Sequence, residues 1–459
     1  HSPKATPFVF SSPAALPGAA PALIEKTAVS FQGKSLSYRA LEQRSESLAQ
    51  RLCDLGIPAS DTLGKPAIAV SLERGIDADV AILAILKSGY ACVPIDPAHP
   101  TSYKQAALAK SGAGLLLVEP GAFTDGLPVR QSTLAPLEGG VTSASSLETE
   151  HPAGQTDLLL FTSGTTGEPK GVMLSLAGVV QAAKAFARRI DICSSSVVAQ
   201  FAGLSFDAAV FEILLAYLHG ARLEILPETS RQDMNELSTS LDKGAITHLL
   251  LPAALAPYLP LRKHAALQAL VCIGDALDER VFWSWAELCP TFNGYGPSEA
   301  SICTSLHAVV PREPVTLGEP LDHISWALGG PEGKELLISG PGLSLGYAGD
   351  LWQTNARFQT GADGKIWYHS GDQVEEVNSS YRFAGRRDFQ VKIRGQRIEL
   401  GEIESALKAS EGVREAVVVA REIGNGHIGD IGQVLGLVGP ENRVTEQAGK
   451  QQQRLFIVI

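Results

Sequence analysis

The sequence has few cysteine and histidine residues, and those present are spaced too far apart to act together. The six cysteines include no C-x-x-C pair and lie at positions 53, 92, 193, 272, 289 and 303. This spacing favours buried thiols in a reducing compartment over a disulfide framework. The ten histidines form no H-x-x-x-H pattern and no cluster with cysteine, so the sequence gives little support to a zinc site.

The chain also lacks a long apolar run and an excess of positive charge. No stretch reaches the roughly 18 apolar residues of a membrane span, and the first residues lack the basic-then-apolar plan of a signal peptide. We therefore expect a cytoplasmic protein that does not bind a membrane. The net charge of −11 argues against nucleic-acid binding, so a phosphate ligand would need local cations such as Lys170, Arg386 and Lys392.

Strand and helix patterns alternate through most of the chain. At 459 residues the chain is long enough for two or three domains. The predicted helices lie at 36–55, 77–89, 175–188 and 208–218, and the predicted strands at 67–72, 90–96, 115–118, 158–161, 172–174, 197–201 and 221–226. This alternation predicts an α/β fold whose sheets are covered by helices on both faces.

The pattern changes after residue 310 to short strands separated by glycine and aspartate turns. These strands lie within 315–321, 335–347, 365–377 and 381–400, and they predict a smaller β-rich unit. A helix at 400–413 and a strand at 415–422 are expected to follow. The charged stretch at Arg387–Asp388 predicts a domain boundary, which divides the chain into residues 1–387 and 388–459.

The stretch "DLLLFTSGTTGEPKGVMLS" at 157–175 places glycines, hydroxyl side chains and Lys170 between two apolar strands. Such a loop suits a polyphosphate, because backbone N–H groups without bulky neighbours can approach its oxygens closely. The spacing Gly164-x-x-Gly167-x-x-Lys170 is not that of a Walker A motif. The alternative is a tight hairpin turn that carries a lysine by chance.

Eight stretches in the same order resemble the adenylation domains of nonribosomal peptide synthetases. These domains belong to the adenylate-forming superfamily, which also includes acyl-CoA synthetases and firefly luciferase. The motifs are "LSYRALE" (36–42), "LKSGYACVPIDP" (86–97), "FTSGTTGEPKGVM" (161–173), "FDAAVFEIL" (206–214), "NGYGPSEASIC" (293–303), "GKELLISGPGLSLGY" (333–347), "YHSGDQV" (368–374) and "GRRDFQVKIRGQRIELGEIE" (385–404). The resemblance implies a large N-terminal subdomain with a small β barrel-like unit, and a small mobile α+β C-terminal subdomain that pivots at Asp388.

The resemblance also implies a reaction in which a carboxylate attacks the α-phosphate of ATP with Mg²⁺ as a cofactor. The residues expected to bind ATP are Ser163, Gly164, Thr165, Thr166, Gly167, Lys170, Gly274, Asp275, Ala276, Asn293, Gly294, Tyr295, Asp372 and Arg386. Those expected to act in catalysis are Thr165, Thr166, Lys170, Glu299, Arg386 and Lys392, with Lys392 acting in the second, thioester-forming state and Glu299 as the magnesium ligand. Without the resemblance, Glu299 could be a solvated glutamate at a helix start, Asp372 a turn residue and Tyr295 a core residue.

Asp207 bears on the substrate class. Its position before an apolar-periodic run predicts a helix N-cap, whereas the resemblance implies that its carboxylate pairs with the α-ammonium of an amino acid. The rest of the implied pocket is neutral: Ala208, Phe211, Leu250, Val271, Ile273, Gly294, Ile302 and Cys303. A charged substrate side chain would be buried there unpaired, so we expect a bulky neutral one, either aromatic, branched aliphatic or an N-acylated ornithine. The sequence is also similar in character to fungal siderophore synthetases.

The chain departs from the family at its C-terminal end. The last motif, with its essential lysine, is missing, although "RLFIVI" resembles the strand that precedes it. We expect this lysine to lie a short way past Ile459; the alternative is a degenerate domain that binds without catalysing. No phosphopantetheine attachment motif is present, so we expect the carrier domain to be a separate segment. The other expected partner is a condensation domain of the same synthetase, and we expect the chain to be a monomeric fragment of that larger enzyme. An acyl- or aryl-CoA ligase remains the alternative activity.

Overall fold

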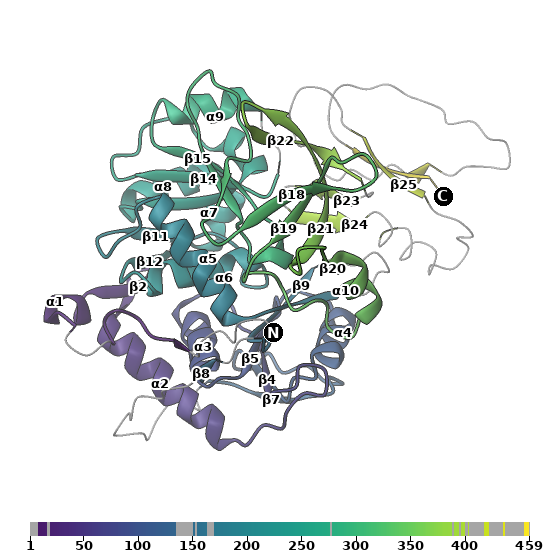
Figure 1. The fold of residues 1–459 in the computed structure, drawn as a ribbon. Coiled ribbons are helices and arrows are strands. Elements are labelled where there is room, and N and C mark those ends of the chain that lie inside the picture. Colours follow the sequence, from purple (N-terminus) through teal and green to yellow (C-terminus); the bar gives the residue numbers. More distant parts are fainter. Residues whose placement is uncertain are drawn as a thin grey trace.

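The computed structural model of the protein describes residues 8–15, 19–134, 150–151, 154–162, 169–275 and 278–387. Beyond these it describes the short segments 390–393, 396–399, 417–421, 435–436 and 454–458, together with residue 403. The fold is α/β, and two large mixed sheets with helices between and around them form its body (Figure 1).

The larger sheet has nine described strands. In spatial order they are β17 (Glu319–Pro320), β16 (Ser305–Ala308), β15 (Thr291–Tyr295), β14 (Ala269–Ile273), β13 (His248–Pro252), β11 (Val197–Gln200), β12 (Arg222–Ile225), β2 (Thr27–Phe31) and β3 (Lys34–Ser37). The strands from β15 to β2 pair in parallel, and antiparallel strands close both edges. In open parallel sheets, ligands bind beyond the carboxyl ends of the strands, and the candidate site lies at that edge.

The second sheet has six described strands. In spatial order they are β10 (Lys170–Leu174), β9 (Leu158–Thr162), β5 (Ala91–Pro94), β4 (Ala67–Ser71), β6 (Leu115–Val118) and β7 (Arg130–Ser132). All of its pairs are parallel except β9 and β10, which form a hairpin. A separate two-stranded ladder joins β1 (Phe8–Val9) to β8 (Glu150–His151). The glycine-rich loop therefore connects two paired strands, and Lys170 is the first residue of the second strand rather than part of the loop.

Helices cover both sheets on each face. The core between the sheets contains side chains of α2 (Tyr38–Asp54), α3 (Ile76–Lys87), α5 (Leu176–Arg189) and α6 (Asp207–Tyr217). The outer face of the nine-stranded sheet packs on α8 (Met234–Lys243), η1 (Ala253–Tyr258) and α9 (Glu279–Ala286). The outer face of the six-stranded sheet packs on α4 (Thr101–Ser111). The remaining described helices are α1 (Pro21–Ile24), α7 (Glu228–Gln232), η2 (Ser298–Ala300) and α10 (Leu351–Arg357).

Side chains that point alternately to the two faces of a strand explain why each sheet is apolar on both faces. In β4, Ile68 and Val70 join the central core, whereas Ala67 and Ala69 join the core under α4. Because successive strand residues point to opposite faces, a strand covered on both sides reads as one continuous apolar run.

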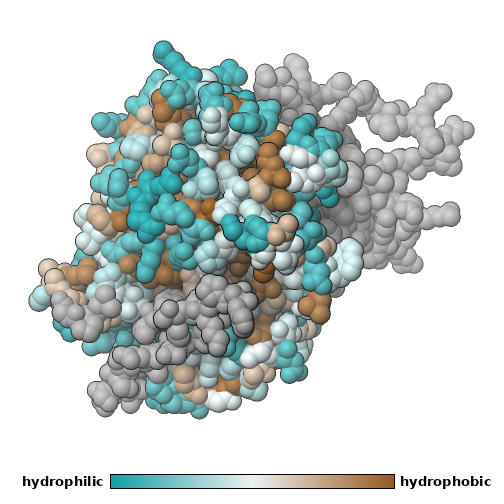
Figure 2. Space-filling model, viewed as in Figure 1, coloured by the Kyte–Doolittle hydropathy of each residue, from teal (hydrophilic) through white to brown (hydrophobic). Residues whose placement is uncertain are grey.

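Hydrophilic residues cover most of the outer surface seen in Figure 2, with hydrophobic residues in small groups between them.

The β-rich unit after residue 310 forms a five-stranded antiparallel sheet. Its strands are β18 (Ser325–Gly329), β19 (Glu335–Ser339), β21 (Ile366–Val377), β20 (Phe358–Thr360) and β22 (Ser380–Arg386), and β22 pairs with β21. The described pairings form an open sheet. The prediction was wrong for 315–321, because β17 within that stretch extends the nine-stranded sheet through antiparallel pairing with β16.

The C-terminal segments that the structure describes are all strands apart from Ile403. They are β23 (Gln390–Ile393), β24 (Gln396–Glu399), β25 (Val417–Arg421), β26 (Leu435–Gly436) and β27 (Arg454–Val458). The strand predicted at 415–422 is confirmed as β25, which pairs with β27. Apart from Ile403, the helix predicted at 400–413 lies outside the described residues. The domain boundary at 387–388 stays a prediction. Within the described part of the chain, no helix is long and apolar enough to cross a membrane.

Candidate functional site

Three parallel strands bring four of the predicted substrate-pocket residues together. The strand register places Leu250 beside Val271, and Ile273 beside Gly294. These residues lie on the face of the nine-stranded sheet that turns toward the central core, where Leu250 and Val271 are buried. A Cβ atom added to Gly294 would lie 3.2 Å from Val271 Cγ1 and 3.5 Å from Ile273 Cδ1. A larger residue at position 294 would therefore reduce the space over these two side chains.

Helix α6 carries Asp207 and Ala208, which are half-buried, and Phe211, which belongs to the central core. Phe211 is fully buried, and its ring lies edge-on to Phe186 with centroids 5.2 Å apart. The helix is capped by Phe206, whose side chain makes no capping hydrogen bond, and Asp207 is the first helical residue. The N-cap prediction for Asp207 was therefore wrong by one position. The carboxylate still accepts from the Ala208 amide at 2.7 Å, within the first turn where a negative charge is favourable.

Asp207 lies next to the short helix η2 that carries Glu299. The Ser298 hydroxyl donates a hydrogen bond to Asp207 Oδ2, so the two carboxylates belong to adjacent elements linked by one side chain. Glu299 is completely buried and accepts a 2.9 Å hydrogen bond from the Tyr347 hydroxyl. The alternative of a solvated glutamate at a helix start is therefore wrong, because water does not reach this side chain.

The chain turns sharply after Glu299. Ser301 and Ile302 have φ values of 58° and 78°, and the Cys303 amide donates to the Ser301 carbonyl at 2.9 Å. A β-branched residue at the centre of such a γ-turn is strained. The turn packs against Gly296, where an added Cβ would lie 2.5 Å from the Ile302 carbonyl oxygen. This close backbone approach explains the second glycine in "GYGPSE". It also fixes Ile302 and Cys303, which are both buried and which the sequence predicts to line the substrate pocket.

Cys303 is a neutral wall of the implied substrate pocket. Burial raises the pKa of its thiol to about 12, so the side chain carries no charge near neutral pH. Its Sγ donates to the Ser305 carbonyl at 3.3 Å. No disulfide constrains this side chain, because all six cysteines of the chain are free thiols in the structure.

The loop that leads to Asp207 is held by two ionisable side chains, the half-buried Arg74 and the buried Glu212. The Arg74 guanidinium donates to the carbonyls of Gln200, Phe201 and Ala202, and Glu212 accepts from the Ala202 amide at 3.1 Å. Burial raises the pKa of Glu212 to about 8, although Arg74 opposes the shift. These contacts fix the start of α6 and with it the position of the Asp207 carboxylate.

An open pocket lies on the other side of β15. Its cavity volume is about 170 Å³, and it opens to the solvent. Its lining includes the predicted ATP-binding residues Gly274, Asp275, Asn293, Gly294 and Tyr295, together with Glu279, Phe282, Gly296, Val315, Thr316, Leu317, Arg382 and Phe383. The Asn293 amide nitrogen donates to the Thr316 carbonyl at 2.7 Å, which fixes the orientation of this side chain at the pocket wall.

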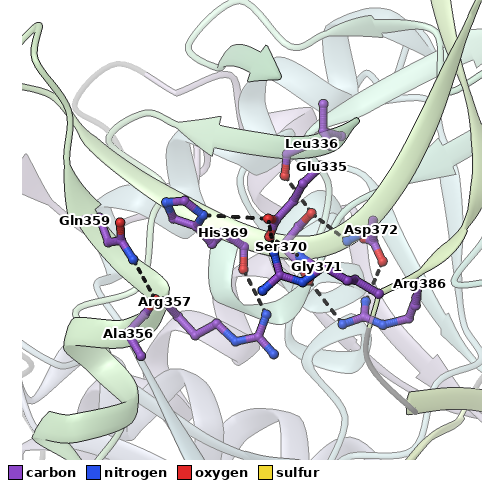
Figure 3. Close-up of polar contacts among 11 residues, drawn as sticks. Glu335, Leu336, Ala356, Arg357, Gln359, His369, Ser370, Gly371, Asp372 and Arg386 are labelled. Atoms are coloured by element: carbon purple, nitrogen blue, oxygen red, sulfur yellow. Dashed lines mark hydrogen bonds and ion pairs between the residues drawn. The ribbon is translucent and has the colours of Figure 1, made fainter. Parts of the chain in front are cut away.

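Asp372, Arg386 and Tyr295 form a buried polar cluster beside this pocket. Asp372 accepts from the Tyr295 hydroxyl at 2.5 Å and from the Arg386 guanidinium, and it is 3% exposed. Arg386 also donates to the Ser370 carbonyl at 3.1 Å (Figure 3). Burial and the neighbouring Asp372 charge raise the pKa of Tyr295 well above its usual value. The alternative of a turn residue is wrong for Asp372, because it lies within β21 and pairs with Arg386 on β22.

A second buried carboxylate supports this part of the sheet. Glu335 accepts from the Gly371 amide at 3.0 Å and lies 3.8 Å from His369 Nδ1 (Figure 3). It also lies 3.2 Å from Arg387 Nη1. His369, and then Gly371 and Arg387, hold the pKa of Glu335 below its usual range against the opposing effect of burial. The bend at Gly371, whose φ is 79°, is thereby fixed next to Asp372.

One aromatic side chain, that of Tyr347, contacts both Lys170 and Glu299. The Lys170 ammonium is 3.6 Å from the ring centroid of Tyr347, and the hydroxyl of the same tyrosine donates to Glu299. Sequence reasoning missed Tyr347, Ser298 and Thr316 as site residues. The available signals were that Tyr347 ends one quoted motif and that Ser298 immediately precedes Glu299 in another.

Several predicted site residues cannot be placed. Ser163, Gly164, Thr165, Thr166, Gly167, Ala276 and the hinge residue Asp388 lie outside the described residues. Lys392 is described only as part of β23. Their assigned roles stay predictions.

Comparison with known proteins identifies the family. The family model of AMP-binding enzymes matches residues 18–348. The chain belongs to the AMP-binding enzyme family. It is therefore a member of the adenylate-forming superfamily, as the eight sequence motifs predict, and enzymes of this superfamily use ATP.

Individual relatives point to nonribosomal peptide synthetases. The chain is 31% identical to tyrocidine synthase 1 of Brevibacillus parabrevis over 423 residues, which are 88% of this chain and 38% of that protein. It spans still less of some other relatives, such as 6% of bacitracin synthase 3 of Bacillus licheniformis, to which it is 30% identical. An adenylation–carrier protein fusion, NpsA-ThdA from Klebsiella oxytoca, is similar in structure with a TM-score of 0.78 and 25% identity, covering 87% of this chain and 83% of that one.

A multidomain synthetase provides a further structural match. The four-domain nonribosomal peptide synthetase AB3403, solved with AMP and glycine, has a TM-score of 0.72 and 27% identity to this chain. The match covers 88% of this chain and 31% of that protein. The adenylation-domain fold predicted from the sequence is confirmed by these similarities.

Proposed function

We propose that the chain activates an amino acid with ATP and Mg²⁺ and then passes it to a carrier-protein thiol. In the first step a carboxylate oxygen of the amino acid attacks the α-phosphorus of ATP. The bond to the β-phosphate oxygen breaks, which gives aminoacyl-AMP and pyrophosphate. In the second step a phosphopantetheine thiolate attacks the acyl carbon and AMP leaves. The substrate supplies the nucleophile, so the protein acts by positioning and by electrostatic stabilisation.

The observation that carries this proposal is the proximity of Asp207 to Glu299 through Ser298. An α-ammonium paired with Asp207 would leave the α-carboxylate, two bonds away, close to phosphates held at Glu299. The residues present also fit ATP. The ribose hydroxyls would donate to Asp372, the adenine would lie against Tyr295 in the open pocket, and the Asn293 amide oxygen is an acceptor for its amino group.

A magnesium site with Glu299 as its one protein ligand fits the described residues better than a site built entirely from protein side chains. Among the described residues, no group of three His, Cys, Asp or Glu side chains could hold a metal ion. Mg²⁺ commonly takes one or two carboxylates and completes its shell with phosphate oxygens and water. The buried Glu299 carboxylate would supply the protein ligand. The hydroxyls of Ser163, Thr165 and Thr166 would hold the β- and γ-phosphates through hydrogen bonds. Lys170 would add a positive charge, and Arg386 would contact the nucleotide.

The proposed substrate has a bulky neutral side chain. None of the eight positions that surround Asp207 in the implied pocket carries a charge, and the Cys303 thiol stays neutral. A charged side chain would lie unpaired there at a cost of several kcal/mol. Aromatic, branched aliphatic and N-acylated ornithine side chains meet this requirement, and the last of these would suit siderophore synthesis. The carrier and condensation domains of a synthetase are the proposed partners.

Substitution of Asp207 tests the proposal against an acyl- or aryl-CoA ligase. Asp207→Ala should reduce amino-acid-dependent ATP–pyrophosphate exchange about 10- to 100-fold, because a hydrogen bond to a charged group contributes about 1.5–3 kcal/mol. Asp233→Ala is the matched control, since Asp233 caps α8 through the Asn235 amide away from the site. Unchanged activation by Asp207→Ala, or faster turnover of a plain carboxylic acid than of any amino acid, would contradict the assignment.

A further inference from the structure

We infer that Tyr347 is a positioning residue that holds Lys170 and Glu299 ready for Mg·ATP, an inference that rests on the function proposed above. Tyr347 is 2% exposed, and its amide donates to Thr354 Oγ1 at 2.9 Å. Residues 345–348 run along β10 through backbone hydrogen bonds and a bridge between Val172 and Tyr347. The tyrosine is thus fixed to the strand that begins with Lys170.

The aromatic face of Tyr347 is a binding site for the Lys170 ammonium. The separation of 3.6 Å from nitrogen to ring centroid lies well within the range of a cation–π interaction. The ring is kept in place by Phe358, which packs edge-on with centroids 5.8 Å apart. The lysine that follows the glycine-rich loop therefore has a defined position over this ring, beside the site.

The hydroxyl of the same residue orients Glu299. The 2.9 Å hydrogen bond to Oε1 is made inside the protein, where Glu299 has no access to water. A buried carboxylate needs hydrogen-bond donors, and these donors determine where its oxygens point. Groups that orient a metal ligand in this way commonly change metal affinity about 10- to 100-fold when they are removed.

The arrangement also separates two opposite charges. The ammonium lies over the ring face, whereas the hydroxyl projects from the ring edge toward the carboxylate. In a buried environment a lysine and a glutamate attract each other strongly, and a direct ion pair would compete with the phosphates for the lysine and with the metal for the carboxylate. The tyrosine binds both groups while keeping them apart, so that each can act on Mg·ATP.

Two variants and one control test this role through binding rather than turnover. Calorimetric titration of the whole chain with ATP is done once with Mg²⁺ and once with EDTA. Tyr347→Phe keeps the ring and should lower the Mg²⁺-dependent gain in ATP affinity about 10-fold, with unchanged affinity in EDTA. Tyr347→Leu should in addition weaken ATP binding in EDTA. Tyr38→Phe removes another buried hydroxyl, which donates to the Ala221 carbonyl at 2.7 Å, and should keep both affinities.

The outcomes separate this inference from the proposed function. If Tyr347→Phe keeps the full wild-type gain in ATP affinity from Mg²⁺, the role of the hydroxyl is overturned. The same holds if the ATP affinity of the wild-type chain does not change with Mg²⁺. Equal losses in Tyr347→Phe and Tyr38→Phe would reduce the effect to general destabilisation and also overturn it. If the wild-type chain binds Mg·ATP without amino-acid-dependent exchange, the proposed function fails, while the binding comparison still decides the role of Tyr347.

Discussion

Replacing Asp372 with asparagine should weaken both the fold and nucleotide binding. The carboxylate is 3% exposed and accepts from two donors, the Tyr295 hydroxyl and the Arg386 guanidinium. Asparagine keeps one acceptor oxygen but presents an amide N–H₂ to the second donor, and it removes the negative charge beside the Arg386 guanidinium. Removing one partner of a buried ion pair costs about 3–5 kcal/mol, and we expect the lower end because one acceptor remains.

Nucleotide binding gives the second part of this prediction. If Asp372 accepts from the ribose hydroxyls, its loss should raise the KM for ATP about 10- to 100-fold, the effect of about 1.5–3 kcal/mol for a hydrogen bond to a charged group. Urea unfolding measures the first effect and pyrophosphate exchange over a range of ATP concentrations the second. Asp363→Asn is the control, because Asp363 lies in an exposed turn and accepts from the Lys365 amide. A destabilised variant with a wild-type KM for ATP would refute the ribose assignment, and wild-type stability would refute the buried ion pair.

Three further predictions concern the turn, the core and the loop. Gly296→Ala should destabilise the chain in urea unfolding and reduce adenylation, because the new Cβ would lie 2.5 Å from the Ile302 carbonyl oxygen; wild-type values would contradict that close approach. Burial raises the pKa of Glu212 from its ordinary 4.5 to about 8, so the unfolded chain loses this proton first and stability should fall as the pH rises between these values. Glu212→Gln should make the fall in unfolding free energy between pH 5.5 and 8 smaller, as measured by urea unfolding at pH 5.5, 7 and 8. The part of the fall that remains is due to Asp79, whose pKa is raised to about 7. An unfolding free energy that falls as steeply with pH as in the wild type would contradict this. Lys170→Ala should slow adenylation more than it weakens amino-acid binding, and equal losses would argue against a phosphate role.

Much of the fold could be predicted because local patterns and long-range packing agree. The continuous apolar runs of β4, β6 and β9 indicated strands buried on both faces, and their predicted positions match the structure closely. The error at 315–321 arose because a two-residue strand carries no signal for the sheet it joins. The pairing of β17 with β16 depends on contacts between chain segments that the sequence order does not specify.

The candidate site could be predicted only in part, since motifs name residues without showing their contacts. The sequence indicated Glu299 and Lys170 separately, but the tyrosine between them lies 48 residues from Glu299 and reaches it through the path of the chain. Similarly, no pattern shows that Tyr295 donates to Asp372 across two sheets. Residues with recognisable chemistry were found, whereas the residues that position them required the structure.

Amino-acid-dependent ATP–pyrophosphate exchange tests the central claim most directly. The assay uses the whole chain, with a panel of bulky neutral amino acids, charged amino acids and acylated hydroxyornithines. We predict exchange with one bulky neutral class and none with the charged amino acids. Exchange driven by a charged side chain would contradict the proposed pocket, and no exchange with any amino acid would contradict amino-acid activation itself.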